Sequence, residues 1–392
     1  MITSASLHTH EIDNPVKALE EIQAQLGAKL ALKKNSVGIL HCGADFVESG
    51  VVSYLGKNLP FPIVGATTTS QAANDVFGSL ILTILVMTSD DAVFLPTRTV
   101  GLAADLAGSI ERSVPDPQRI PALPLKLVLV YPPVIEAYSG DSYVSILESL
   151  YGEVPVFGSL SVEEEIMTYA RNATFYNDEC LVDEMSYLLI YGDVTPQFFI
   201  SHLQQTYNLL PAGTITKADG NMLHEIEGVP ALDFFESIGF LKNRDTLSGV
   251  AFVPLVLSLQ DKNTGKSSRF VRGLVSFDEK GSALCRGTIY ENAVLTIGSN
   301  SADDIIAASR NTIHLLNQTE NYRTVLIYSC VVRRTVLISN PLIELETVRN
   351  TICKDIPFMM AYAGGEICPT NYAAGDGVTN RFHNFSLIAC AF

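Results

Sequence analysis

The chain has 392 residues and a mass of 42.5 kDa, which predicts two or three domains. Hydrophobic residues make up 47% of the chain and charged residues 17%, and this composition excludes intrinsic disorder because it supplies a sizeable apolar core. Asp and Glu outnumber Lys and Arg by 42 to 26, giving a net charge of −16. That balance argues against a nucleic-acid-binding surface, which needs clustered basic residues.

The N-terminal segment and the cysteines indicate the compartment. Residues 1–16 hold neither Lys nor Arg and no apolar run, so they do not resemble a secretory signal. Apolar stretches such as residues 80–87 are too short to span a membrane. The seven cysteines are an odd number without a C-x-x-C pair, which argues against a disulfide framework or a zinc site. Free thiols are typical of the reducing cytosol, and we therefore expect a cytoplasmic protein.

A strand–helix–strand pattern opens the chain. Residues 37–42 predict a short buried strand, residues 47–59 a helix, and residues 62–65 a second short strand that ends in glycine. A long apolar strand over residues 79–87 closes this unit.

The same order of elements occurs twice more. The second copy has predicted strands at residues 126–131, 154–158 and 185–191 and a helix at 142–151. The third copy has predicted strands at residues 323–330, 356–360 and 385–392 and a helix at 342–353. A proline lies at the corresponding place in each copy, namely Pro62, Pro155 and Pro357. Three copies in one order indicate an internal repeat.

Composition shifts predict two domains. Residues 115–124 contain four prolines and predict an extended connector between the first two copies. We predict an N-terminal domain over residues 1–210, with units at 37–94 and 126–200, and a C-terminal domain over residues 211–392. In the latter, antiparallel strands precede the third unit at residues 323–392. The predicted class is mixed α/β, with repeated strand–helix–strand units and mixed parallel and antiparallel sheets in two halves.

Catalytic and phosphate-binding motifs are incomplete. The glycine–lysine sequence at residues 50–58 has one residue too many for a phosphate-binding loop and ends in Asn. The sequence contains no H-E-x-x-H, G-x-S-x-G or EF-hand spacing. It therefore predicts a protein that is not an enzyme, and it selects no metal site.

Polar residues follow the predicted strands, at the sheet edge where ligands bind in open α/β folds. The first two copies place there His41, Cys42, Thr67, Thr68, Thr69, Tyr131, Gly158, Ser159 and Ser161. The third copy is the most polar, with Ser329, Cys330, Arg333, Gly364, Gly365, Glu366, His383 and Asn384.

Each third-copy residue has more than one interpretation. Cys330 is either a small buried side chain or a nucleophile, and it forms a dyad with His383 only if the two meet in space. Arg333 either binds a ligand carboxylate or pairs with Glu366. Gly365 serves the backbone geometry. His383 is a structural histidine, a proton carrier or a metal ligand.

These third-copy motifs resemble the C-terminal FIST domain. The matching runs are Tyr-Ser-Cys330-Val-Val-Arg333, then Ile-Pro-Phe-Met-Met-Ala-Tyr-Ala-Gly-Gly365-Glu366-Ile, then Phe-His383-Asn384 before a final strand. Residues 214–232 resemble the segment that links the two FIST halves, and residues 62–68 resemble the N-terminal half. Met360 stands where the family has glycine, and residues 202–211 also depart from its pattern.

The resemblance implies an intracellular sensory module that binds a small ligand such as an amino acid. A stand-alone member signals through a separate partner, such as a histidine kinase of a two-component system or a diguanylate cyclase. The residues expected to bind the ligand are Cys330, Arg333, Gly365, Glu366, His383 and Asn384. The resemblance also allows a haem-binding nitric oxide sensor, for which the sequence selects no proximal ligand. A third alternative, from the residues themselves, is a hydrolase or transferase that uses Cys330 and His383.

Overall fold

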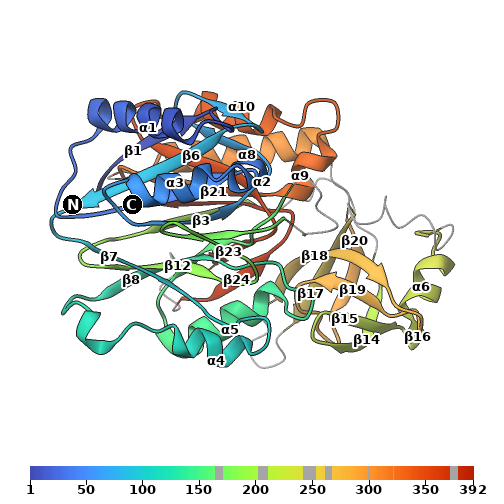
Figure 1. Cartoon of the computed structure of the whole chain (residues 1–392). Coiled ribbons are helices and arrows are strands. Elements are labelled where there is room, and N and C mark those ends of the chain that lie inside the picture. The colour runs from blue at the N-terminus through green and yellow to red at the C-terminus, as the bar shows by residue number, and fades with distance from the viewer. Residues whose placement is uncertain are drawn as a thin grey trace.

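Three sheets of the same construction form most of the molecule, and a fourth sheet forms a smaller body beside them (Figure 1). The computed structural model describes residues 1–163, 171–201, 211–241, 253–260, 267–298, 301–320, 322–370 and 378–392. In this part of the chain, parallel and antiparallel strands share sheets that are covered by helices. The predicted mixed α/β class is therefore confirmed.

Each repeated unit begins with a strand and a helix that precede the predicted pattern. The first unit contains β1 (Thr3–Thr9), α1 (Pro15–Lys29), β2 (Asn35–Cys42), α2 (Ala44–Glu48), α3 (Val51–Asn58), β3 (Ile63–Thr67), β4 (Gln71–Ala73), β5 (Phe77–Gly78) and β6 (Leu82–Ser89). The second contains β7 (Val93–Arg98), α4 (Leu106–Arg112), β8 (Leu125–Tyr131), α5 (Gly140–Tyr151), β9 (Val156–Ser159), β10 (Thr174–Tyr176), β11 (Glu179–Leu181) and β12 (Ser186–Tyr191). The third contains β13 (Gln197–Ser201), α8 (Ala302–Asn317), β21 (Val325–Cys330), α9 (Val331–Val336), α10 (Ile343–Thr351), β22 (Phe358–Ala363), β23 (Glu366–Pro369), β24 (Asn380–His383) and β25 (Leu387–Ala391).

The three six-stranded sheets have equivalent strand orders. These orders are β1-β6-β2-β3-β10-β11, β7-β12-β8-β9-β23-β24 and β13-β25-β21-β22-β4-β5. In each sheet the third and fourth strands are parallel, as a strand–helix–strand crossover requires, and the flanking strands are antiparallel.

The outer hairpin of every six-stranded sheet comes from another unit. β4–β5 of the first unit extends β22 of the third, and β23–β24 of the third unit extends β9 of the second. β10–β11 of the second unit extends β3 of the first, which closes the exchange into a ring. The predicted boundary after residue 210 stays a prediction, and strands from both sides of it share two of the sheets.

The inner faces of the three sheets pack together in one central core. Ile39 of β2, Leu129 of β8 and Leu326 of β21 are all buried in it. The outer faces of the sheets pack against helices in separate clusters, and Figure 1 shows α1, α3, α8 and α10 on one side of this body and α4 and α5 on the other. Because both faces are covered, the central strands are continuous apolar runs rather than alternating ones.

The fourth sheet is inserted between β13 and α8. Its elements are β14 (Pro211–Asp219), β15 (Met222–Ile226), β16 (Val229–Pro230), α6 (Ala231–Ser237), β17 (Pro254–Gln260), β18 (Ser267–Phe277), β19 (Ala283–Arg286) and β20 (Val294–Ile297). All of its described pairings are antiparallel, and a pairing between β14 and β15 closes the sheet on itself. Figure 1 shows this body beside the larger one, with its own apolar core.

Two glycines allow the parallel strands to approach closely. Gly65 of β3 lies opposite Leu40, and Gly158 of β9 lies opposite Val130. A Cβ atom at either glycine would lie 1.9 Å from the carbonyl oxygen of its partner, and φ is +155° and +152° respectively. The equivalent residue of β22 is Met360, which lies opposite Ile327. The third unit therefore lacks this close approach, in agreement with the departure seen in the sequence.

Gly158→Ala should destabilise the protein by roughly 3 kcal/mol or more, since the new methyl group meets a backbone oxygen in a conformation that L-residues avoid. The measurement is the free energy of unfolding in urea. Gly27→Ala is the control because Gly27 is exposed in α1 and its added Cβ would meet nothing within 4 Å. A Gly158→Ala variant as stable as Gly27→Ala would contradict this account of the strand contact.

Candidate functional site

Three buried side chains, one from each unit, meet where the six-stranded sheets converge. His41, Tyr131 and Tyr328 follow Leu40, Val130 and Ile327, so they occupy equivalent positions on β2, β8 and β21. The Tyr328 hydroxyl lies 3.1 Å from His41 Nε2 and 2.9 Å from the Tyr131 hydroxyl. His41 Nδ1 lies 3.0 Å from the carbonyl oxygen of Ala66.

The hydrogen-bond partners determine the tautomer of His41. A carbonyl oxygen only accepts, so Nδ1–H donates to Ala66, and Nε2 accepts from the Tyr328 hydroxyl. Burial lowers the pKa of His41 to about 4, and the bond to Ala66 only partly opposes this effect. The ring is therefore neutral at pH 7. Burial raises the pKa values of Tyr131 and Tyr328, so both remain protonated donors.

His41 should make the protein sensitive to acid. Its folded pKa of about 4 lies below the unfolded value of 6.5, so the unfolded state binds the proton more readily and stability falls as the pH falls from 6.5 to 4. The loss that depends on His41 should reach about 3 kcal/mol, and His41→Gln should remove it. The check is the free energy of unfolding of each protein across this pH range. His314→Gln, at an exposed position of α8, should keep the wild-type profile; a His41→Gln profile with the same acid dependence would refute the assignment.

The carboxyl ends of β3, β9 and β22, with the segments that follow them, hydrogen-bond to one another. Val162 N–H donates to Thr67 O at 3.0 Å, and Leu160 N–H donates to Gly365 O at 3.0 Å. Tyr362 N–H donates to the carbonyl oxygen of Ser70, also at 3.0 Å. The polar edges that the sequence predicts for the three copies therefore meet at one place.

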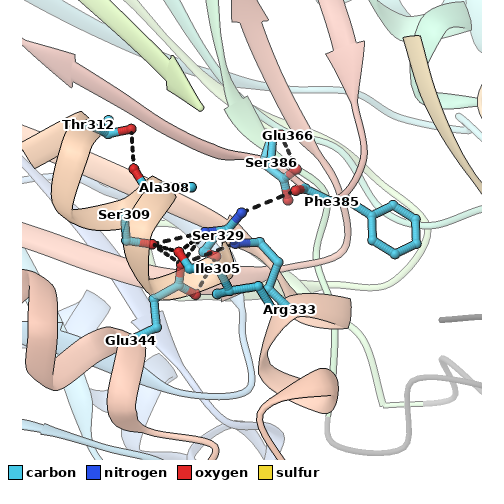
Figure 2. A network of polar contacts seen from close by, with 10 residues as sticks. All are labelled: Ile305, Ala308, Ser309, Thr312, Ser329, Arg333, Glu344, Glu366, Phe385 and Ser386. Carbon is cyan, nitrogen blue, oxygen red and sulfur yellow. Dashed lines mark hydrogen bonds and ion pairs between the residues drawn. The ribbon is translucent and has the colours of Figure 1, made fainter. Parts of the chain in front are cut away.

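Glu366 lies at the centre of the predicted third-copy residues. It is fully buried on β23, directly opposite Ser159 of β9 on one side and His383 of β24 on the other. The Ser386 hydroxyl donates to Glu366 Oε2 at 2.7 Å (Figure 2), and Cys330 N–H donates to the carbonyl oxygen of Ser386 at 3.0 Å. Cys330 is thus held beside Glu366, and hydrogen bonding from its thiol is one of the effects that lower the pKa of this carboxyl group.

Arg333 pairs with Glu344 rather than with Glu366. Both side chains are fully buried, and Arg333 Nη2 lies 2.6 Å from Glu344 Oε1 (Figure 2). The same guanidinium donates to Ser309 Oγ and to the carbonyl oxygens of Ile305 and Phe385. With these bonds in place, Arg333 is a structural cation that links α8, α9 and α10 to the loop before β25.

The remaining predicted residues lie beside Glu366. His383 Nε2 lies 3.1 Å from the carbonyl oxygen of Cys368, and Asn384 Nδ2 donates to the carbonyl oxygen of His383 at 3.0 Å. Gly365 has φ +132°, and a Cβ there would lie 2.6 Å from the ring of Phe382 and 3.4 Å from Asn384 Nδ2. Glycine is therefore required for the backbone geometry next to Glu366.

Several buried polar atoms near Glu366 have no hydrogen-bond partner among the described residues. They are Glu366 Oε1, Asn384 Oδ1, Ser159 Oγ and Ser161 Oγ, and we refer to these four residues as the Glu366 cluster. Ser159 lies opposite Glu366, and a Cβ atom added at Gly364, two residues before Glu366, would lie 2.8 Å from the backbone carbonyl oxygen of Ser161. Buried polar groups are nearly always paired, so four such atoms in one region indicate a place where a ligand or ordered water binds.

Burial determines the ionisation of this region. It raises the pKa of Glu366 to about 8, although the Ser386 hydroxyl and the charge of Arg333 both oppose the shift. Glu366 is therefore mostly protonated at neutral pH. Burial and the proximity of Glu366 also raise the pKa of the Cys330 thiol, which keeps this cysteine from acting as a thiolate.

Of the residues expected to bind the ligand, His383 and Cys330 could in principle ligate haem, but their contacts do not fit this role. The Nε2 atom of His383 already faces a backbone carbonyl, and the protonated Cys330 thiol lies in the buried surroundings of Glu366. Within the described ranges, His, Cys, Asp and Glu residues form no group of three or more that could hold a metal ion.

An open polar hollow of about 440 Å³ lies between the fourth sheet and the larger body. It is lined by Asp141, Glu148, Thr288, Tyr290 and Arg381 among other residues. Asp141 is paired there with the buried Arg272 of β18 at 3.2 Å and accepts from Thr288 N–H at 2.7 Å. These bonds join the two bodies at the wall of the hollow.

The sequence did not reveal Glu344 or Ser386. Glu344 is buried on α10, on the face that also carries Leu345 and Val348, so an acidic residue within the apolar stripe of the predicted helix was the available signal. Ser386 lies immediately before β25 in a chain segment with no local pattern that marks it.

Glu344→Ala should destabilise the protein by about 3 to 5 kcal/mol because it leaves Arg333 buried without a counter-ion. The double substitution Arg333→Met with Glu344→Leu should cost clearly less, since no buried charge remains. Glu225→Ala is the exposed control: it removes an ion pair with Lys217 and should change the free energy of unfolding by less than about 1 kcal/mol. Urea unfolding measures all three, and equal losses for Glu344→Ala and Glu225→Ala would contradict a structural role for this pair.

Comparison with known proteins gives one family and distant structural neighbours. The FIST N domain matches residues 36–229 and the FIST C domain matches residues 231–369. No curated protein sequence matches the chain. Among solved structures, one neighbour is a cyanuric acid hydrolase whose structure is described as an evolutionary innovation by structural concatenation. The alignment covers 67% of this chain and 83% of the hydrolase chain, with 11% sequence identity and a TM-score of 0.26. Another, from A. caulinodans, aligns with 100% of this chain and 99% of its own at 7% identity and a TM-score of 0.35. Similarity at this level supports no statement about activity.

Proposed function

Because the chain belongs to the FIST family, with a FIST N and a FIST C domain, we propose that it is a cytoplasmic sensory protein that binds a small ligand and regulates a separate signalling partner. FIST domains are associated with small-ligand sensing in signal transduction. None of the helices in the described residues is long and apolar enough to cross a membrane.

The observation that supports this function best is the set of unpaired buried atoms in the Glu366 cluster. Leaving a buried acceptor or hydroxyl unpaired costs about 1 to 3 kcal/mol for each group. A ligand that pairs with several of these atoms recovers this free energy only when the surrounding segments hold their described positions. Binding would therefore favour one conformation of the protein, which is how a ligand shifts a population of states.

We propose that the protein does not catalyse a reaction. Support comes from the raised pKa of the Cys330 thiol, which disfavours the nucleophilic thiolate. It also comes from His383, whose Nε2 atom lies against the carbonyl oxygen of Cys368.

The haem-based nitric oxide sensor finds no specific support in the site. Neither His383 nor Cys330 offers an uncommitted ring nitrogen or thiolate in the contacts described above. The kind of partner, whether a histidine kinase or a diguanylate cyclase, stays an expectation from the family.

Ligand binding at the Glu366 cluster is tested by thermal-shift measurements with a library of small metabolites. Wild-type protein should show a higher melting temperature with at least one compound, and Asn384→Ala should reduce this shift because it removes an unpaired acceptor. Ser145→Ala is the control, because Ser145 is exposed and lines the separate hollow beside α5. A shift that survives Asn384→Ala, or that Ser145→Ala abolishes, would place the ligand elsewhere.

A further inference from the structure

We infer that the ligand of the Glu366 cluster is a small uncharged molecule that presents both N–H donors and carbonyl acceptors, as amides, lactams and imides do. This inference rests on the proposed function and concerns the same site. It follows from two properties of the cluster: its charges and its unpaired donors and acceptors.

Among the residues that the structure describes, the cation that acts on Glu366 is already paired, so a charged ligand finds no free counter-ion there. Arg333 is the cation whose charge acts on Glu366, and it is already neutralised by Glu344 at 2.6 Å. Glu366 itself is mostly protonated at neutral pH. An ionised ligand would have to give up its hydration without a partner of opposite charge, which costs several kcal/mol per ion. An uncharged ligand avoids this cost.

The hydrogen-bond network determines which atoms face the ligand. Asn384 Nδ2 donates to the carbonyl oxygen of His383, so Oδ1 is the end left unpaired and it needs a donor. Ser159 Oγ and Ser161 Oγ can each donate to a carbonyl oxygen. An anion such as a carboxylate would supply acceptors alone and leave Asn384 Oδ1 unpaired.

Glu366 can both donate a hydrogen bond to such a ligand and accept one from it. A protonated carboxyl group is a donor and an acceptor, and it can form a paired hydrogen bond with the N–H and C=O of an amide. Oε2 accepts from Ser386 at 2.7 Å, and Oε1 is the unpaired atom. Ser159 lies directly opposite Glu366 on β9, so its hydroxyl lies on the same face of the sheet.

The test uses matched probes that differ in charge. Succinimide and 2-pyrrolidinone are uncharged, and succinate and proline are their anionic and zwitterionic counterparts of similar size. Titration calorimetry at pH 6.5 with wild-type protein should show binding of the uncharged probes and at least tenfold weaker binding of the charged ones. Ser159→Ala should weaken succinimide binding by about tenfold, the loss of one hydrogen bond, while Ser145→Ala should leave it unchanged.

A pH series separates the role of Glu366 from a general loss of structure. The titratable groups near Glu366 are Cys330 of β21, Arg333 of α9, His383 of β24 and Cys368 of β23. Between pH 6.5 and 9, wild-type affinity for 2-pyrrolidinone should fall at least fivefold as Glu366 loses its proton. Glu366→Gln keeps an uncharged donor and acceptor, so its affinity should change less than twofold over the same range.

The outcomes distinguish the ligand class from the proposed function. Failure of both uncharged probes to bind overturns the ligand class, whatever the metabolite library yields. Binding of proline or succinate that Ser159→Ala weakens also overturns the ligand class, but it leaves the ligand site in place. A third outcome is that succinimide binds, but neither Ser159→Ala nor Glu366→Gln changes its affinity or the pH dependence of that affinity. This outcome shows that the cluster is not the site.

Discussion

The hydrogen bonds among His41, Tyr328 and Tyr131 hold the three sheets at a common centre. Each ring comes from a different unit, and each lies edge-on to the other two with centroids 5.3, 5.5 and 6.3 Å apart. A buried polar group needs its partner, so none of the three sheets can shift without leaving at least one of these atoms unpaired. This requirement sets how far β2, β8 and β21 are shifted along their lengths relative to one another. It therefore also sets where the polar residues that follow these strands lie.

The third unit differs from the other two in the residues around Glu366. Met360 replaces the glycine of the other units, and a buried ion pair between Arg333 and Glu344 ties the helices of the third unit together. At the equivalent position of the exchanged hairpin, the first unit has Gln71 and the second has Thr174, but the third has Glu366. Complete burial keeps this one carboxyl group desolvated. The architecture is repeated, whereas the chemistry is concentrated in one copy.

The sequence predicted the parts of the fold that depend on local patterns. Continuous apolar runs located β2, β8 and β21, and the order of elements revealed the three units. The exchange of hairpins such as β23–β24 was not predictable, because a short strand has no pattern that names its distant partner. The strand-end rule brought Cys330, Glu366, His383 and Asn384 to one place, but it could not show that Arg333 already has Glu344 as its partner. That pairing depends on how α10 packs, which the helical period alone does not determine.

The ring of exchanged hairpins has a consequence for synthesis on the ribosome. The first sheet ends with β11 and can be completed once residue 181 has emerged, but β9 of the second unit waits for β23, which starts at Glu366. At about 5 to 20 residues per second, roughly ten to forty seconds pass during which the edge of β9 has no partner. An unpaired apolar edge can pair with another chain. During this interval the β9 edge is exposed, and it is protected only after β23 has emerged.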